Sequence, residues 1–346
     1  MKALFIGLGG IGQRHLRNLQ AIVSEDLEII AFRERNASQV ITDKLAVEEG
    51  VDVQSRFGLK VFHDLKQALA EKPLVAFICN PTSMHMAAAK TAAEHGCHLF
   101  IEKALSDSMD GVDELIALAE AKDLVCMVGY QMRFHPCLQA LEKILQSGSL
   151  GRIIAVNAEV GEYMPGWHKY EDYRQLYAAR KDLGGGVIVS QIHEFDYIQW
   201  LFGLPTSVYA VGGHLSSLAI DVEDVASITM TCLVDGRYIP VHLHQDYLQR
   251  PPTRICKVVG DRGKVVLDFI GLYLTEFDEN GEVVTHADFS DFERNQLFMD
   301  QMRHFIGCIK TGSNPCVTLR GGARSLQMAL AAKKSLQTGK VVILVD

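Results

Sequence analysis

The sequence predicts an α/β Rossmann domain with a doubly wound parallel sheet, followed by an α+β domain with a largely antiparallel open sheet. Two observations predict the first domain: apolar strand-like runs alternate with helical segments up to about residue 128, and a glycine-rich turn joins the first strand to the first helix. A third observation predicts the second domain. Beyond residue 130, strand-like segments follow one another and are separated by glycine, aspartate and asparagine turns.

The N-terminal stretch is the strongest of these signals. Residues 2–6 are a short apolar run, residues 13–23 carry apolar side chains at helical spacing, and residues 27–32 have the character of a second strand. The turn Gly7-Leu8-Gly9-Gly10-Ile11-Gly12 lies between the first strand and the helix. Glycines at this spacing allow a tight turn, close approach of a pyrophosphate, and close packing of the helix on the sheet.

The following helix would present free N–H groups and the positive end of its dipole to that pyrophosphate. We therefore predict a dinucleotide site at the turn; the alternative is a glycine-rich turn in an unrelated α/β protein. The residues predicted to contact the pyrophosphate are Gly7, Gly9, Gly10, Ile11 and Gly12.

Three charged residues after the second strand bear on the choice between NAD and NADP. Glu34 follows Gly12 at the distance where a carboxylate accepts from the ribose 2′-OH, and it would repel a 2′-phosphate. Arg33 and Arg35 flank it and are able to bind that phosphate instead. We expect an NAD(P) cofactor, with NAD favoured.

Composition excludes several classes of protein. The chain has 346 residues, 48% of them hydrophobic and 22% charged, which is ordinary for a globular protein of two domains. The net charge of −8 argues against a nucleic-acid or acidic-membrane partner. No apolar run has the length of a membrane span, and the N-terminus does not resemble a signal peptide. The eight cysteines include no C-x-x-C pair, so we expect reduced thiols in a cytoplasmic protein without a metal site.

The remaining elements are predicted from apolar periodicity, caps and turns. In residues 1–128, the dinucleotide-binding domain, further strands are expected at 60–62, 74–79, 98–101 and 124–128, and helices at 38–49, 64–71, 83–95 and 109–121. In residues 129–346, the domain for substrate binding and oligomerisation, strands are expected at 152–160, 207–214, 225–234, 237–246, 254–259, 264–268 and 271–276, and helices at 134–146, 187–202, 293–310 and 321–337.

Polar residues stand at the ends of three predicted parallel strands, where an open α/β sheet binds its ligand. These are Asn80-Pro81, Glu102-Lys103 and Gly129-Tyr130. A lysine directly after a buried strand would lie beside the nicotinamide, where its ammonium can hold a reacting oxygen. The alternative for Lys103 is a solvated lysine at a strand end.

A second candidate lies after Gly184-Gly185-Gly186, on a helix that carries Ser190, His193 and Asp196. His193 and Asp196 are three residues apart, so Asp196 is placed to orient the imidazole. With an ordinary pKa of about 6.5, His193 would move a proton in either direction. The alternative is a structural histidine.

Two further groups of residues are weaker candidates. A polar and aromatic tract upstream of the triple glycine either lines a substrate pocket or fills a loop core; its members include Tyr163, Trp167, His168, Tyr173 and Arg174. His242, His244 and Asp246 alternate along one strand and share a face. They are of metal-binding type, although a polar sheet face or subunit contact is the simpler interpretation.

Taken together, several motifs resemble the glucose–fructose oxidoreductase / inositol 2-dehydrogenase (Gfo/Idh/MocA) family over essentially the whole chain. They are Gly7-x-Gly9-x-x-Gly12, Pro81-x-x-x-His85, Glu102-Lys103, Gly129-Tyr130-x-x-Arg133-Phe134-His135-Pro136, and the triple glycine before His193. The resemblance implies NAD(P)-dependent oxidation or reduction of sugars, cyclitols and their derivatives. It also implies a homodimer or homotetramer formed through the open sheet of the second domain.

The resemblance places the family's catalytic lysine on Lys103 and its catalytic histidine on His193. It adds Asn80, Pro81, His85, Glu102 and Lys103 to the expected cofactor contacts, and Lys103, Arg133, Ser190 and His193 to the expected substrate contacts. The sequence departs from the family pattern at Ala104, where many members have proline, and at Ser190, where many carry an aspartate. The segment around His193 resembles a subgroup associated with bacterial surface-sugar biosynthesis.

The functional hypothesis is therefore a cytoplasmic dehydrogenase or reductase of a sugar-like hydroxyl or carbonyl, with a small-molecule substrate and no nucleic-acid or membrane partner. The competing hypothesis is a non-catalytic regulator that uses the same fold to sense a dinucleotide. Lys103 together with His193 favours the enzyme, because a sensor needs neither.

Overall fold

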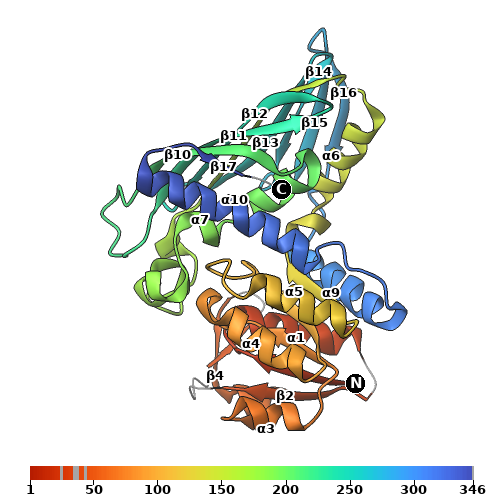
Figure 1. The fold of residues 1–346 in the computed structure, drawn as a ribbon, viewed down its shortest axis with the longest axis vertical. Helices are drawn as coiled ribbons and strands as arrows, with labels where there is room; N and C mark the ends of the chain where they lie inside the picture. The colour runs from red at the N-terminus through yellow and green to blue at the C-terminus, as the bar shows by residue number, and fades with distance from the viewer. Residues whose placement is uncertain (24–25, 34–38, 43–44, 345–346) are drawn as a thin grey trace.

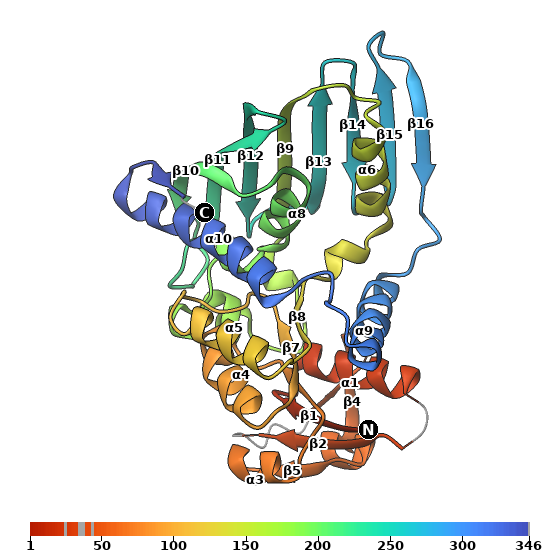
Figure 2. The same cartoon turned by 45° about the vertical axis from the view of Figure 1, so that its right-hand side comes forward.

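The computed structural model describes residues 1–346 apart from 24–25, 34–38, 43–44 and 345–346. Two parts are stacked along the long axis of the molecule (Figure 1). The N-terminal part is a parallel sheet with helices on both faces, and the C-terminal part is a large sheet with helices packed along one face (Figure 2). Both predicted fold classes are confirmed.

The first sheet has six parallel strands in the order β5-β2-β1-β6-β7-β8. The strands are β1 (Lys2–Ile6), β2 (Glu28–Phe32), β5 (Lys60–Phe62), β6 (Val75–Ile78), β7 (His98–Glu102) and β8 (Cys126–Gly129). The order reverses between β1 and β6, and a doubly wound sheet binds its ligand beyond the strand ends at such a point. The predicted site residues after β1, β6 and β7 therefore share one edge of the sheet.

Helices from distant parts of the chain cover the two faces of this sheet. One face packs against α1 (Gly10–Ile22) and α9 (Arg294–Thr311), and the other packs against α4 (His85–Glu94) and α5 (Val112–Ala121). Phe305 of α9 contacts the rings of Phe77 and Phe100 edge-on, with centroids 6.0 and 5.4 Å apart. A helix near the C-terminus thus completes the core of the N-terminal part. The boundary at residue 128 stays a prediction.

The predicted helix at 38–49 is wrong. Its described residues form the hairpin of β3 (Gln39–Ile41) and β4 (Val47–Asp52). The Gln13 side chain, on α1, donates to the carbonyl of Gln39 at 3.0 Å and accepts from the N–H of Ile41 at 2.8 Å. These contacts satisfy the strand backbone, so tertiary structure overrides the local helical propensity. Two short helices follow, α2 (Val53–Phe57) and α3 (Leu65–Ala70).

The second sheet has nine strands in the order β16-β15-β14-β13-β9-β12-β11-β10-β17. All neighbouring pairs are antiparallel except β9 and β12. The strands are β9 (Ile153–Gly161), β10 (Pro205–Gly213), β11 (Val225–Val234), β12 (Arg237–Asp246), β13 (Thr253–Gly260), β14 (Gly263–Asp268), β15 (Tyr273–Asp278), β16 (Val283–Asp288) and β17 (Val342–Ile343). The sequence prediction missed the two edge strands, β16 and β17.

In the part of the chain that the structure describes, helices cover one face of this nine-stranded sheet and not the other (Figure 2). They are α6 (Pro136–Ser147), α7 (Val187–Ser190), α8 (His193–Phe202) and α10 (Leu319–Thr338). The helix predicted at 187–202 is divided into α7 and α8 at residues 191–192. The opposite face leaves large apolar side chains exposed, among them Tyr209, Val211, Leu233 and Tyr238.

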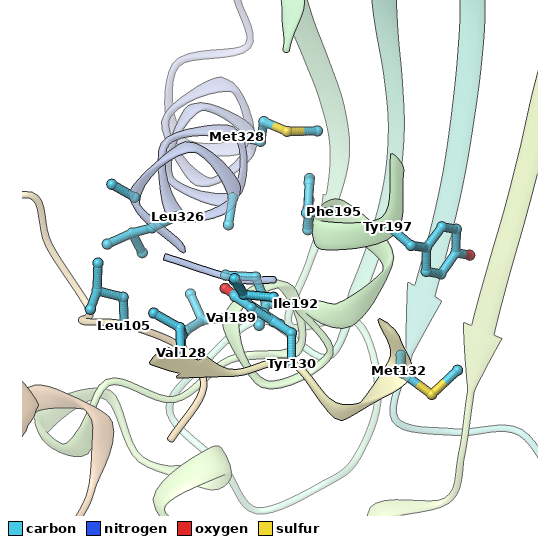
Figure 3. Close-up of a cluster of buried hydrophobic side chains, with 14 of the residues drawn as sticks. Leu105, Val128, Tyr130, Met132, Val189, Ile192, Phe195, Tyr197, Leu326 and Met328 are labelled. Atoms are coloured by element: carbon cyan, nitrogen blue, oxygen red, sulfur yellow. The ribbon is translucent and has the colours of Figure 1, made fainter. Parts of the chain in front are cut away.

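One continuous core joins the two parts. Figure 3 shows Val128 and Tyr130 at the end of β8 packed among Val189 and Ile192 beside α8, with Leu326 of α10 above them. Six short 3₁₀ segments complete the described structure: η1 (Thr82–Met84), η2 (Gln131–Phe134), η3 (Met164–Gly166), η4 (Tyr173–Gln175), η5 (Tyr177–Ala179) and η6 (Lys181–Leu183). None of the helices in the described part of the chain has the length and apolar character needed to cross a membrane.

Candidate active site

The glycine turn has the close contacts that its sequence predicts. Gly7 has a positive φ of 94°, and a Cβ atom there would lie 2.6 Å from the N atom of Asn80. A Cβ atom on Gly12 would lie 2.3 Å from the carbonyl oxygen of Gly7, so only glycine lets α1 approach the sheet this closely. At Gly9, by contrast, an added Cβ atom would meet no described atom within 4 Å.

Gly9 is also the N-cap residue of α1 and provides no side-chain acceptor for the first N–H groups of the helix. The open space at Gly9 and these uncapped N–H groups fit the pyrophosphate of a dinucleotide. Ile11, in the first turn of α1, is half-buried beside the apolar core.

The second domain reaches this turn through Tyr170. A Cβ atom on Gly10 would lie 2.8 Å from the Tyr170 hydroxyl oxygen. The pKa of Tyr170 is raised to about 12, by burial first and then by the carboxylate of Glu171. Tyr170 belongs to the polar and aromatic tract, but sequence reasoning did not select it, because nothing in the tract shows which ring folds back over the turn.

The end of β6 is joined to the end of β7 by a buried histidine. Nε2 of His85 lies 2.9 Å from the carbonyl oxygen of Asn80, and Nδ1 lies 2.8 Å from the carbonyl oxygen of Ala104. His85 is only 1% exposed, and burial lowers its pKa. The Oδ1 atom of Asn80 is buried without a partner among the described residues, and Pro81 precedes η1. Thus Asn80 lies at the expected cofactor edge, whereas the His85 ring contacts that edge from inside the protein.

Glu102, the last residue of β7, is 6% exposed and contacts the helix of the glycine turn. Its Oε1 atom lies 2.6 Å from Nε2 of His15 on α1. Its Oε2 atom accepts a hydrogen bond from the backbone N–H of Lys103 at 3.2 Å. Sequence reasoning missed His15; its place three residues after Gly12, on the buried side of α1, is the signal that was available.

The side chain of Lys103 crosses from the first domain to the second. Its Nζ atom donates to the carbonyl oxygen of Ser190 at 2.7 Å and to the hydroxyl oxygen of Tyr177 at 3.2 Å. Lys103 is thus held between the strand end and the glycine-rich segment that precedes His193. The solvated-lysine alternative does not fit these two bonds. Tyr177, from the aromatic tract, was not selected from the sequence.

His193 is the first residue of α8 and is 5% exposed. Its Nε2 atom lies 3.1 Å from Nε2 of the Gln131 side chain, and its Nδ1 atom is buried without a partner among the described residues. Tyr130 packs edge-on against the imidazole, with ring centroids 5.8 Å apart.

The expectation of an ordinary pKa for His193 is wrong. Burial lowers its pKa well below 6.5, and the positive charge of Lys103 lowers it further. The imidazole is therefore neutral at neutral pH and able to accept a proton. Ser190, one turn earlier, has its hydroxyl oxygen buried without a partner in the described structure.

Asp196 does not orient His193. Its carboxylate accepts two hydrogen bonds from the Arg133 guanidinium, at 2.7 and 2.9 Å, and one from the Ser325 hydroxyl at 3.3 Å. The Arg133 guanidinium also lies over the ring of Trp200, 4.6 Å from its centroid. The charge of Arg133, an expected substrate contact, is thus already paired inside the protein.

The five aromatic-tract candidates make mostly contacts within the second domain. Tyr163 lies under the Arg250 guanidinium, at 4.0 Å, and Trp167 contacts Tyr247 edge-on at 5.2 Å. The remaining three are accounted for by local bonds: His168 with Glu171, Tyr173 with the backbone of Ala219, and Arg174 with Asp172. Within the described structure none of the five is hydrogen-bonded to Lys103 or His193, whereas Tyr177 is bonded to Lys103.

Two other predicted groups are the charged residues after β2 and the polar side chains on β12. Glu34 and Arg35 lie outside the described residues; burial lowers the pKa of the neighbouring Arg33. His244 contacts Asp246 at 3.1 Å, and His242 contacts Ser227 at 3.2 Å. No cluster of three or more His, Cys, Asp or Glu side chains suited to a metal ion occurs among the residues that the structure describes.

The fold and this site define a class: a dinucleotide-dependent oxidoreductase with an N-terminal Rossmann domain. A sequence profile described as "Oxidoreductase family, NAD-binding Rossmann fold" matches residues 1–130, and the profile "GFO/IDH/MocA C-terminal domain" matches residues 138–266. The chain belongs to the Gfo/Idh/MocA family of NAD-binding oxidoreductases.

Individual relatives agree with this assignment along most of the chain. Myo-inositol 2-dehydrogenase of Thermotoga maritima is 26% identical, over 99% of this chain and 98% of the relative. UDP-N-acetylglucosamine 3-dehydrogenase of Acidithiobacillus ferrooxidans is 29% identical, over 78% of this chain and 74% of the relative. The WlbA dehydrogenase of Bordetella pertussis, solved with NADH and UDP-GlcNAcA, shares the fold with a TM-score of 0.79 and 19% identity, over 100% of this chain and 99% of that structure.

Proposed function

We propose that this protein transfers a hydride between NAD and the hydroxyl-bearing carbon of a sugar, a cyclitol or a sugar derivative. The observation that supports the proposal is that Lys103, at the sheet edge that also bears the glycine turn, donates to the carbonyl oxygen of Ser190, three residues before His193, and that its charge helps to lower the pKa of His193. The names of the relatives support a sugar or cyclitol substrate. A dinucleotide sensor has no use for a buried neutral imidazole beside a lysine ammonium.

In the direction of oxidation, two side chains work on the hydroxyl oxygen. The Lys103 ammonium donates a hydrogen bond to that oxygen and stabilises the negative charge that develops on it. His193, neutral because its pKa is lowered, accepts the hydroxyl proton. Bound NAD would supply the hydride acceptor for the carbon, so that the alcohol would become a carbonyl. In reduction the imidazole would return the proton.

The remaining residues have supporting roles in this proposal. The turn from Gly7 to Gly12, with Asn80 and Glu102, holds the cofactor, and Glu34 favours NAD. Ser190, whose hydroxyl is unpartnered among the described residues, takes the place of the family's aspartate and hydrogen-bonds the substrate. Tyr163, Trp167, His168, Tyr173 and Arg174 line the approach to the site, and Tyr177 joins Lys103.

Assembly and location belong to the same proposal. The open face of the nine-stranded sheet, with Tyr209 41% and Tyr238 68% exposed, suits a homodimer or homotetramer interface. All eight cysteines are free thiols, which suits a cytoplasmic location. The segment around His193 favours a role in bacterial surface-sugar metabolism.

Substrate oxidation tests the proposal directly. The protein would be mixed with NAD and, in separate reactions, with myo-inositol, with UDP-N-acetylglucosamine and with a panel of free hexoses, while NADH formation is followed by absorbance. We expect NADH to form with at least one compound, and Lys103→Ala to slow its formation by a factor on the order of 10² or more. NADH binding to the parent protein without turnover of any sugar or cyclitol would favour the sensor.

A further inference from the structure

The lysine turn, residues 102–104, lies between two buried histidines that come from different helices. His15 of α1 contacts the residue before Lys103, with its Nε2 atom 2.6 Å from Oε1 of Glu102. His85 of α4 contacts the residue after Lys103, with its Nδ1 atom 2.8 Å from the carbonyl oxygen of Ala104. Each histidine therefore holds one side of the lysine turn.

Both rings are fixed in place by the core. His15 is 0% exposed, and it packs edge-on against Phe100 and Phe298 with ring centroids 4.8 and 6.0 Å apart. His85 is 1% exposed; its neutral ring has one N–H, which we assign to Nδ1 at the Ala104 carbonyl oxygen, while Nε2 lies 2.9 Å from the carbonyl oxygen of Asn80 without donating to it. Both rings are enclosed by protein groups, so each acts on Lys103 through the neighbouring residue that it contacts.

The contact from His15 continues to the backbone of Lys103. The second oxygen of Glu102 accepts a hydrogen bond from the N–H of Lys103 at 3.2 Å. The Lys103 backbone is thus linked to α1 through Glu102 and to α4 through Ala104. A small rotation of this backbone would move Nζ, at the end of a four-carbon side chain, away from the Ser190 carbonyl oxygen that it contacts at 2.7 Å.

We infer that His15 and His85 are positioning residues for Lys103, which together fix the lysine turn so that Nζ lies at the reacting oxygen. The role of Lys103 in turnover rests on the proposed function. Its placement by the two histidines does not. It connects the helix that binds the cofactor to the group that acts on the substrate. Reacting groups must be held within a fraction of an ångström by the residues behind them.

Isosteric substitutions distinguish the effect of losing the hydrogen bond from the effect of losing the imidazole ring. Glutamine places an amide nitrogen near the position of a histidine Nε2 atom, and asparagine places one near Nδ1. His15→Gln and His85→Asn therefore keep the hydrogen bond to the lysine turn, whereas His15→Leu and His85→Leu remove it. His98→Leu is the matched control: His98 stands at the opposite end of the same strand, where its Nδ1 atom accepts from the N–H of Val125 at 3.0 Å.

Trace acetylation of the cofactor-free protein measures how accessible and reactive the Lys103 amine is, and it requires no substrate. Each variant would be labelled with a small amount of isotopic acetic anhydride, and the label on Lys103 measured by mass spectrometry relative to exposed Lys90. We expect labelling of Lys103 to rise about tenfold in the two leucine variants, the factor that corresponds to one lost hydrogen bond to a charged group. His15→Gln, His85→Asn and His98→Leu should label like the parent.

Unchanged labelling in folded His15→Leu and His85→Leu would overturn the inference, as would an equal rise in His98→Leu. If the leucine variants do not fold, His85→Asn and His85→Gln are compared instead, because only the first keeps the bond to Ala104. More label on Lys103 in His85→Gln supports the inference, and equal label overturns it.

Kinetics with a substrate found above give the second readout. We expect kcat at saturating NAD to fall about tenfold in the leucine variants, because Lys103 acts on the substrate; saturation removes any effect on cofactor binding through Asn80 and Glu102. Equal kcat in all variants would overturn the inference. If no substrate is found, the proposed function fails while the labelling experiment still decides the placement of Lys103.

Discussion

The Arg133 guanidinium and the Asp196 carboxylate form two hydrogen bonds, of 2.7 and 2.9 Å, between side chains that are 9% and 0% exposed. Arg133 follows β8, and Asp196 lies in the first turn of α8. The pair therefore fixes α8 against the end of the Rossmann sheet. Because His193 begins that helix, the pair acts on the imidazole only through the backbone of α8 and not by a bond to the ring.

Asp196→Asn should damage stability more than chemistry. It leaves the buried charge of Arg133 without a counter-ion, which we expect to cost about 3–5 kcal/mol in the free energy of unfolding. The kcat of the folded fraction should fall much less than in His193→Ala, and Ser190→Ala should cost the least turnover. Urea denaturation and kcat per NADH-binding site measure the two effects.

The matched control is Asp182→Asn, since Asp182 forms a similar two-bond pair with Arg180 on the exposed surface. Its stability should stay near that of the parent, because solvent screens an exposed pair. Equal losses in the free energy of unfolding in Asp196→Asn and Asp182→Asn would mean that the Arg133–Asp196 pair does not fix α8.

Removal of the Lys103 ammonium should separate cofactor binding from turnover. We expect Lys103→Ala to bind NADH with nearly the parent Kd and to lower kcat by a factor on the order of 10² or more, since it loses the group that stabilises the reacting oxygen. NADH fluorescence titration and initial rates give the two quantities. Lys90→Ala, on the exposed side of α4, is the control, and a kcat equal to that of the control would remove Lys103 from the mechanism.

The lowered pKa of His193 gives a pH dependence with a definite sign. Oxidation requires the neutral imidazole, so kcat/KM should fall only when the pH falls below the pKa of His193 in the folded protein. Because burial and Lys103 place that pKa well below 6.5, the oxidation rate should persist at mildly acidic pH. A midpoint near 6.5 that vanishes in His193→Ala would show that burial does not depress the pKa of His193.

His193→Ala itself should lower oxidation by a factor on the order of 10²–10⁴, the usual effect of losing a general base. His98→Ala is a suitable control, because it removes a half-buried histidine from the opposite end of β7. A parent-like rate and pH profile in His193→Ala would make His193 a structural histidine.

The sequence predicted the fold and the position of Lys103 directly after a buried strand, because both depend on local chemistry. Buried strands, glycine geometry, and a lysine directly after a strand leave short-range signals. The hairpin at residues 39–52 was missed because its backbone is satisfied by Gln13, which lies far away in sequence. Tyr177 and His15 were missed for the same reason: their contacts with Lys103 and Glu102 arise only when the domains and helices pack.

Asp196 shows the limit of spacing arguments. Two residues three apart on a helix share a face, but the partner that Asp196 finds comes from another element. Arg133 offers two parallel donors, and a buried carboxylate gains more from these than from one imidazole nitrogen. Helical periodicity cannot reveal which of two candidate partners is nearer.

We predict that the choice between NAD and NADP depends on Glu34. We expect NADH to bind more tightly than NADPH, because the carboxylate accepts from the ribose 2′-OH and repels a 2′-phosphate. Glu34→Gln should narrow the difference by strengthening NADPH binding, whereas Glu48→Gln, farther along the chain, should leave it unchanged. Fluorescence titration of each protein with both cofactors provides the comparison, and tighter binding of NADPH by tenfold or more to the parent would contradict the expectation.

His135 should make the protein less stable in mild acid. It is 3% exposed, and burial together with the positive charge of Arg254 lowers its pKa from 6.5 to about 4. Between about pH 4 and pH 6.5, His135 is therefore protonated in the unfolded chain and neutral in the folded protein. The free energy of unfolding thus falls as the pH decreases from 6.5 toward 4. From about pH 7 to about pH 5 this one group should lower the free energy of unfolding by about 2 kcal/mol.

His135→Asn keeps an acceptor for the N–H of Cys137 at the start of α6 but does not titrate, so its urea-derived stability should fall less than that of the parent over the same interval. Other buried groups titrate equally in both proteins and cancel in this comparison, so parallel pH dependences in the parent and His135→Asn would show that His135 does not lose its proton on folding.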